Sequence, residues 1–354
     1  MYTEGIILEC IKQIKDNRTI YGIYHILAGK KSIQSVHDAR LFRLEKYYGI
    51  YQTMTRESFI SIITTMQKNN LIKMDKDYYQ ITDTGEAVLK EYRASNLVTY
   101  LNGIRFTGRD ITFIERLYLL VQTYSNIKAN NNAFIPIIDR PEITSWVRTF
   151  YQQKRHIDIT ETLYKELYQL LTYVSDLEAE FFINRFTGYK YIGRSMDQLA
   201  NEYQLTRDNA SILLIGIIHR LLHVIGDESS TFEILTDVAS VTTNNQKFIT
   251  NTANQTYQLL RDGYHIQQIA DKRNLKLNTI YDHIVEIALY DRDMEIESFV
   301  KEEDQSEILA AIQKARSYKL KAIKDHCHDS ISYFQIRLVL ARLKELLPGD
   351  DMHD

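Results

Sequence analysis

Residues that break helices are scarce in this sequence. Only three prolines and thirteen glycines occur in 354 residues, which favours helices over a β-rich fold. Cysteine is scarce too, because Cys10 and Cys327 lie far apart and are the only two, so no disulfide framework is indicated. The first thirty residues show no charged start followed by an apolar run, as a secretory leader would. Together these absences predict a cytoplasmic protein.

Long apolar runs and a large net charge are also lacking. The apolar segment 212–222 is interrupted by His219 and Arg220, and it stays short of the roughly 18 residues of a membrane span. We therefore expect no membrane insertion. The net charge at pH 7 is only -3, so any contact with DNA has to come from local patches rather than from bulk electrostatics.

The first hundred residues contain a helix, a hairpin and a second helix, in that order. Residues 57–70 carry apolar side chains at helical spacing, and residues 71–81 indicate two short strands joined by a turn. Thr82 is suited to cap the helix that follows. This order predicts a winged-helix-like domain with a small β-hairpin over residues 1–100. Its role, in DNA binding or in dimerisation and docking, stays open because its helix has only Arg56 and Lys68 as basic residues.

Residues 101–250 are expected to form a helical middle domain. Apolar periodicity predicts helices at residues 110–125, 142–153 and 161–182. A polar stretch from Thr242 to Asn254 then predicts a linker, with the last domain boundary near residue 250.

Two helix-turn-helix units recur about seventy residues apart. The first covers residues 193–224, where Thr206 is suited to cap a long second helix, and the second opens a C-terminal domain at residues 251–354. The second helix of the first unit is so apolar that we expect it to be scaffold. Duplication and convergent packing both explain the match, since every such unit needs a small residue between its helices and an apolar residue in its turn. The matching residues are Ala200 and Leu205 in the first unit, and Ala270 and Leu275 in the second.

The second unit carries the candidate DNA contacts. Ile280, Ile284 and Ile287 form the inner stripe of its second helix, with Asn278 as the predicted cap. The turn and the first helical turn, where helix-turn-helix proteins contact base edges, then point outward. The outward residues are Lys276, Asn278, Thr279, Tyr281, Asp282 and His283.

This stretch resembles the helix-turn-helix domain found at the C-termini of many RecQ-family DNA helicases. The run from Ile331 to Ala341 resembles the end of the same domain. The whole chain is similar to the YpbB family of Firmicutes, whose members are encoded beside a RecQ-type helicase. The resemblance implies a stand-alone accessory to a helicase that lacks this domain itself. The residues that carry the first match are Gly263 to Ala270, Leu275, Asn278, Thr279, Ile280 and His283.

The charge of the C-terminal domain departs from that of a tight DNA binder. Residues 252–347 hold fourteen Lys and Arg against fifteen Asp and Glu, and the second helix carries Asp282 and Glu286, where DNA contacts favour Lys or Arg. Residues 314–324 are predicted to form a basic helical segment that contains no acidic residue. This segment is a better candidate for phosphate contact than the second helix. A solvated surface helix would have the same composition, so that alternative stays open. The basic residues of the segment are Lys314, Arg316, Lys319, Lys321 and Lys324.

A recognisable active site is missing. Residues 325–329 hold Asp, His and Cys, but adjacent ligands on one turn splay apart and no second cluster accompanies them, so we expect no metal. Residues 29–32 are similar to the end of a phosphate-binding loop, but Tyr24 stands where the first glycine is required. No nucleophile elbow or paired-carboxylate motif is visible. We therefore predict that the protein is not an enzyme and uses no cofactor.

The sequence thus predicts a mainly α, multi-module protein with an N-terminal winged-helix-like domain and a C-terminal helix-turn-helix domain. The predicted function is that of a non-catalytic DNA-associated adaptor that acts with a RecQ-type helicase in DNA repair or recombination, and the partnership rests on the resemblance. Two alternatives stay open. A transcription regulator would bind a palindromic site as a dimer, and a protein-interaction module would not bind DNA. The oligomeric state is not predicted.

Overall fold

The computed structural model confirms the mainly α fold class. Within the part of the chain that it describes, a single two-stranded sheet accompanies the helices. The described residues are 2–95, 97–131, 133–154, 159–240, 249–291 and 293–346.

The N-terminal part has the predicted helix, hairpin and helix. The hairpin strands pair antiparallel, from Ile72 opposite Ile81 to Asp75 opposite Tyr78. Thr82 caps the next helix as predicted, because its hydroxyl accepts a hydrogen bond from a backbone N–H of the first turn. The elements are α1 (Tyr2–Ile14), α2 (Ile20–Leu27), α3 (Ile33–Leu41), the 3-10 helix η1 (Glu45–Tyr47), α4 (Arg56–Lys68), β1 (Ile72–Asp75), β2 (Tyr78–Ile81), α5 (Asp83–Arg93), α6 (Leu97–Tyr100) and α7 (Gly103–Phe106).

The middle part is helical, with one departure from the prediction. The single helix predicted over residues 161–182 is wrong, since the chain leaves the helix after Leu171 and Ser175 starts a new one. Ser175 and Glu178 form a capping box, which satisfies free N–H groups at the new helix start. The elements are α8 (Arg109–Lys128), α9 (Pro141–Lys154), α10 (Ile159–Leu171), α11 (Asp176–Ile183), α12 (Met196–Glu202), α13 (Arg207–Asp227) and α14 (Glu233–Ala239).

Helix α13 is a core helix, as its apolar sequence predicted. It packs against α1, α6, α8 and α12. His219 in its middle is fully buried, with Nε2 3.3 Å from the Asp110 carboxylate and Nδ1 accepting the Asn102 backbone N–H at 3.1 Å. Among the described helices, α13 alone is long and apolar enough to cross a membrane, but 67% of its most apolar window is buried inside the protein. Packing within the fold therefore accounts for its composition.

The C-terminal part repeats the turn geometry of the first helix-turn-helix unit. The Leu205 N–H bonds the Ala200 carbonyl at 2.8 Å, and the Leu275 N–H bonds the Ala270 carbonyl at 2.9 Å. Asn278 is not the predicted cap, because the second helix already begins at Leu277 with Lys276 as its N-cap residue. The elements are α15 (Asn251–Arg261), α16 (Ile266–Arg273), α17 (Leu277–Tyr290), α18 (Glu302–Ala315), α19 (Leu320–Lys324), α20 (Tyr333–Ala341) and α21 (Leu343–Leu346).

The predicted linker ends earlier than expected. Thr250 caps α15, so residues 251–254 are helical rather than extended. Residues 242–248 of the predicted linker lie outside the described residues.

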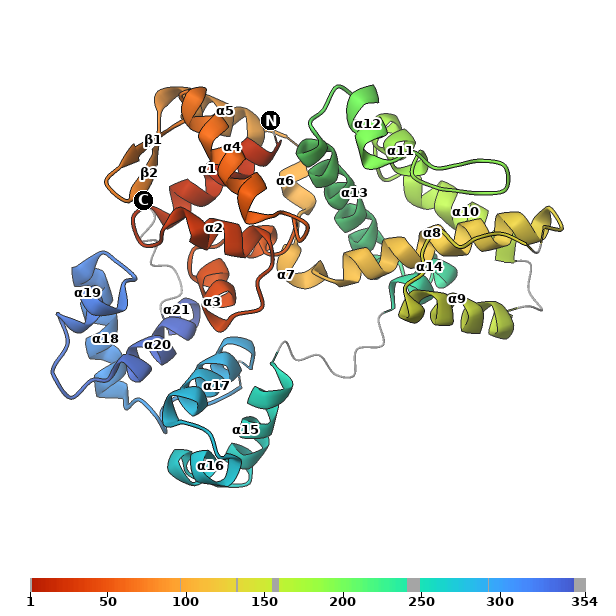
Figure 1. Ribbon diagram of the computed structural model, residues 1–354. Coiled ribbons are helices and arrows are strands. Elements are labelled where there is room, and N and C mark those ends of the chain that lie inside the picture. Colours follow the sequence, from red (N-terminus) through yellow and green to blue (C-terminus); the bar gives the residue numbers. More distant parts are fainter. Residues whose placement is uncertain are drawn as a thin grey trace.

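The N-terminal part contacts both other parts. Figure 1 shows the C-terminal helices beside the N-terminal ones, with α8 to α14 extending to the other side. Helix α3 packs against α17 and α20, and the Arg40 guanidinium lies 4.7 Å from the centre of the Tyr290 ring. The C-terminal domain is thereby held against the winged helix.

Candidate nucleic-acid interface

Helix α4, which precedes the hairpin, has a more open face than α13 and α17, the second helices of the two helix-turn-helix units. Only Phe59, Ile63 and Met66 of its thirteen residues are buried. Its exposed residues include Thr64, Thr65, Gln67 and Lys68, whose hydroxyl, amide and ammonium groups can all contact phosphate or bases. The charge of this helix gave no sign of its open face, because Arg56 and Lys68 are its only basic residues.

Helix α17, the predicted recognition helix, is instead a core helix of the C-terminal domain. Eight of its fourteen residues are buried, and it packs against α15, α16, α20 and α3. A helix that is covered on both flanks cannot lie along the major groove, and only its first turn remains accessible.

The prediction that His283 points outward is wrong. His283 is 5% exposed, and its Nδ1 shares a 2.9 Å hydrogen bond with the Thr256 hydroxyl of α15. Burial lowers the pKa of His283, and the positive charge of Arg273 lowers it further. This imidazole ties α17 to α15 inside the domain.

Glu286, the second acidic residue of α17, is buried inside the C-terminal domain. Its carboxylate is 4% exposed and accepts hydrogen bonds from the backbone N–H and hydroxyl of Thr250, the cap of α15. Burial raises the pKa of Glu286 despite these two donors. Glu286 therefore stabilises the start of α15.

Of the other residues predicted to contact DNA at the start of α17, some contact a neighbouring helix and others are exposed to solvent. Tyr281 stacks on Phe334 with ring centres 4.3 Å apart, and Asp282 pairs with Arg337 at 2.7 Å, so both belong to the contact with α20. Thr279 is half-buried. The exposed candidates at the turn are Lys276 and Asn278.

The basic segment from Lys314 to Lys324 is not the continuous helix that was predicted. Helix α18 ends at Ala315, Arg316 adopts a left-handed conformation with φ 46°, and α19 starts at Leu320. Lys314 in the last turn of α18, Arg316 in the turn that follows and Lys321 in α19 are exposed to solvent. Lys324 instead donates to the carbonyls of His328 and Asp329 at 3.0 and 3.1 Å. Its ammonium group is therefore partly committed to the loop that follows α19.

This turn docks on the N-terminal winged helix. The Tyr318 N–H and the Ser317 hydroxyl both donate to the Asn17 side chain, at 2.8 and 3.0 Å. The Lys319 ammonium donates to the Tyr78 hydroxyl at 3.1 Å and lies 3.8 Å from the Asp16 carboxylate. Lys319 is thus a contact between domains rather than a free phosphate ligand.

The docking places the hairpin beside the basic turn. Side chains alternate along a strand, so the register puts Lys73 on the face of the hairpin that carries Tyr78. The hairpin itself is electrically balanced, since exposed Lys73 and Lys76 are matched by exposed Asp75 and Asp77. The excess positive charge therefore comes from the C-terminal domain. We call Lys73, Lys76, Lys314, Arg316 and Lys321 the wing–turn surface.

Apart from the open face of α4, the exposed candidate residues form two separate surfaces. Lys276 and Asn278 lie at the turn between α16 and α17, whereas the wing–turn surface lies at α19 and the hairpin. Figure 1 shows α16 and α19 at opposite ends of the C-terminal domain.

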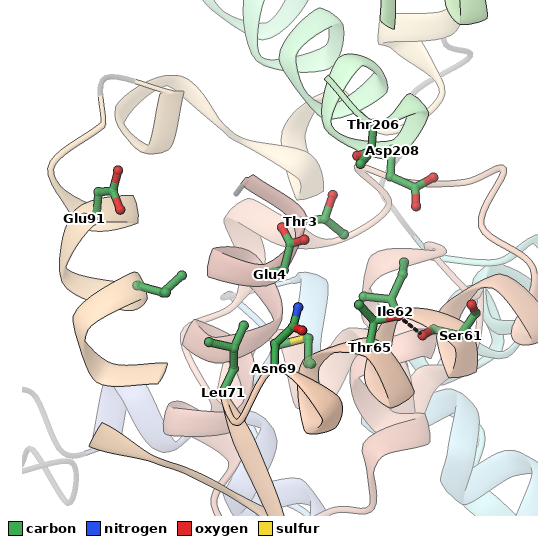
Figure 2. Close-up of a pocket in the computed structure, with 12 residues that line it drawn as sticks. Thr3, Glu4, Ser61, Ile62, Thr65, Asn69, Leu71, Glu91, Thr206 and Asp208 are labelled. Carbon is green, nitrogen blue, oxygen red and sulfur yellow. Dashed lines mark hydrogen bonds between the residues drawn. The ribbon is translucent and has the colours of Figure 1, made fainter. Parts of the chain in front are cut away.

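A groove beside α4 is unsuited to phosphate. It has a volume of about 480 Å³ and lies between α1, α4, α5 and the start of α13. Figure 2 shows the carboxylates of Glu4, Glu91 and Asp208 around it. Its lining includes no Lys or Arg, so a phosphate there would meet negative charge alone.

The residues that the structure describes contain no cluster of side chains suited to bind a metal ion. No three His, Cys, Asp or Glu side chains there come together as a metal site requires. In residues 325–329, the His328 N–H donates to the Glu307 carboxylate of α18, and the His328 ring bonds the Ser330 hydroxyl.

The fold and the wing–turn surface define a helical protein built from winged-helix and helix-turn-helix modules of the DNA-binding kind. Comparison with known proteins agrees. The RQC domain family matches residues 6–100, and a helix-turn-helix domain family matches residues 252–340. Both domains are found in RecQ-family helicases, so the resemblance inferred from the sequence is confirmed.

The chain is also similar to a known protein along almost its whole length. It is 28% identical over 347 residues to protein YpbB of Bacillus subtilis (strain 168), which covers 96% of this chain and 97% of YpbB. No solved structure matches the chain.

Proposed function

We propose that this chain is a non-catalytic DNA-binding accessory protein that acts with a RecQ-type helicase in DNA repair or recombination. One observation carries the proposal. The basic turn of the helix-turn-helix domain docks on the hairpin of the RQC domain through Lys319 and Tyr78, so two domains of RecQ helicases present one surface. We propose that the protein works in the cytoplasm.

Phosphate neutralisation is the proposed mode of binding. Lys314, Arg316 and Lys321 supply the charge, and Lys73 and Lys76 extend it onto the hairpin. Contacts of this kind give affinity that falls steeply with salt and carries little sequence information. The accessible first turn of α17 adds only Lys276 and Asn278.

The burial of α17 weighs against a sequence-specific transcription regulator. Direct readout needs several side chains of one helix at base edges, and Tyr281, Asp282 and His283 are engaged inside the domain. A structure-directed role on forked or single-stranded DNA fits the remaining surface better.

Two measurements test this proposal. The first is co-purification of the chain with a RecQ-type helicase encoded beside it. The second is titration of single-stranded, duplex and forked DNA at low and moderate salt. We expect a stable complex and salt-dependent binding. A chain that binds the helicase but no DNA at low salt would be a protein-interaction module, and a chain that binds neither would end the adaptor proposal.

A further inference from the structure

The loop between α11 and α12 exposes aromatic and apolar side chains at its tip. Tyr189, Tyr191 and Ile192 are 40%, 49% and 85% exposed, and Lys190 between the tyrosines is exposed as well. Figure 1 shows this loop projecting beyond α11 and α12. Exposed apolar side chains that gather in one place in this way mark interaction sites.

The loop is fixed by hydrogen bonds rather than extended freely into solvent. Gly188 and Tyr191 form an antiparallel bridge, with N–H to carbonyl distances of 2.9 and 3.2 Å. The Tyr189 N–H donates to the Ser125 hydroxyl at the end of α8, at 3.1 Å. At the base, the Gly193 N–H donates to the Thr187 hydroxyl at 3.0 Å. The tyrosines are therefore pre-positioned, which lowers the entropy cost of binding.

The charge of the loop is positive. Residues 184–194 contain three Lys or Arg and no Asp or Glu. The Lys190 ammonium lies 5.3 Å from the centre of the Tyr189 ring, and exposed Lys128 follows Ser125 by one helical turn on α8. Arg194 is engaged with Glu202, and Arg185 donates to the Arg194 carbonyl, so Lys190 and Lys128 are the cations that a ligand meets.

We propose that this loop binds single-stranded nucleic acid by stacking bases on Tyr189 and Tyr191, with Lys190 and Lys128 at the phosphates. Aromatic rings beside cations are the chemistry that non-specific single-strand binders use. The inference rests on the proposed function and adds a second contact, in the middle domain, to the wing–turn surface. A forked substrate would then offer its duplex to that surface and a free strand to the loop.

The test compares two oligonucleotides that have the same number of phosphates. One is an oligothymidylate, and the other has abasic sites in place of the bases. We expect the protein to bind the first more tightly, and the combined Tyr189→Ala and Tyr191→Ala variant to bind both alike. Its loss of affinity for oligothymidylate should be about 5-fold to 150-fold for each base that loses its stacking ring. The variant with both tyrosines changed to Phe should keep the affinity.

A control removes a ring that is even more exposed, elsewhere on the protein. Tyr168 on α10 is 68% exposed, and the Tyr168→Ala variant should bind oligothymidylate as the unchanged protein does. Unchanged affinity in the double Ala variant would overturn the inference, and release of the helicase by that variant would assign the loop to a protein partner instead. If forked DNA binds while oligothymidylate does not, the loop inference fails and the proposed function stands. If no DNA binds at all, both fail.

Discussion

Removing the two exposed cations that flank the α18–α19 turn should flatten the salt dependence of DNA binding. Arg316 and Lys321 are exposed, so changing both to Gln removes charge with little effect on the fold. Each neutralised phosphate on duplex DNA contributes about 0.9 to the slope of log affinity against log salt. Two contacts contribute about 1.8. Raising the salt fourfold, from about 50 to about 200 mM, should then weaken the unchanged protein about 12-fold more than the variant.

Fluorescence anisotropy of a labelled forked duplex, measured across that salt range, gives both slopes. The matched control changes Lys154 and Lys165 to Gln, which removes the same charge from α9 and α10, where these lysines pair with Asp237 and Glu161. The control should keep the full slope. Equal slopes for the two double variants would show that the effect is one of net charge alone, and an unchanged slope in the turn variant would refute the phosphate contact.

Three further predictions concern the packing of the domains. Gly103→Ala should destabilise the protein by about 1 to 3 kcal/mol in urea unfolding, because a Cβ there would lie 2.1 Å from the Tyr48 carbonyl oxygen; an unchanged midpoint would contradict this close approach. Glu166→Gln should cost about 1.5 to 3 kcal/mol, since the buried carboxylate accepts two backbone N–H groups at the start of α14, and chemical denaturation with the Tyr168→Ala variant as control measures the difference. The pKa of His283 is lower in the folded protein than in the unfolded chain. As the pH falls below about 6.5, the imidazole is therefore protonated in the unfolded chain before it is protonated in the folded protein. The free energy of unfolding should consequently decline toward pH 5. The melting temperature of His283→Gln should therefore depend less on pH in this window, and a slope equal to that of the unchanged protein would argue against the shift.

Local signals in the sequence were enough to predict much of the fold. Thr82 and Thr206 cap helices as predicted, because a hydroxyl just before an apolar-periodic run satisfies N–H groups within the same few residues. The break between α10 and α11 was missed, since the apolar pattern continues through Tyr173 and Val174 while the chain turns. Only the Ser175 capping box marks the new start, and a serine inside an apolar run is a weak signal.

The candidate site was harder to predict because its errors depend on contacts between distant segments. His283 follows Ile280 by three residues, so it lies on the flank of the buried stripe rather than opposite to it. Whether that flank faces solvent is decided by α15, which covers it with Thr256. Lys319 in turn is committed by Tyr78, which lies 241 residues earlier in the chain. Neither partner could be identified from periodicity or charge.

Both terminal parts of the chain contribute charge around the hairpin. Residues 73–77 contribute two Lys and two Asp, so the hairpin alone offers phosphate no net attraction. The docked turn changes this, because Arg316 and Lys321 stay exposed while Lys319 is consumed in holding the turn against the Tyr78 ring, 4.7 Å from its centre. The exposed positive charge beside the hairpin thus comes from the region that matches the helix-turn-helix family, which begins about 150 residues after the RQC match ends. Separating the two would leave a balanced hairpin on one side and, on the other, a basic turn without the hairpin that completes its surface.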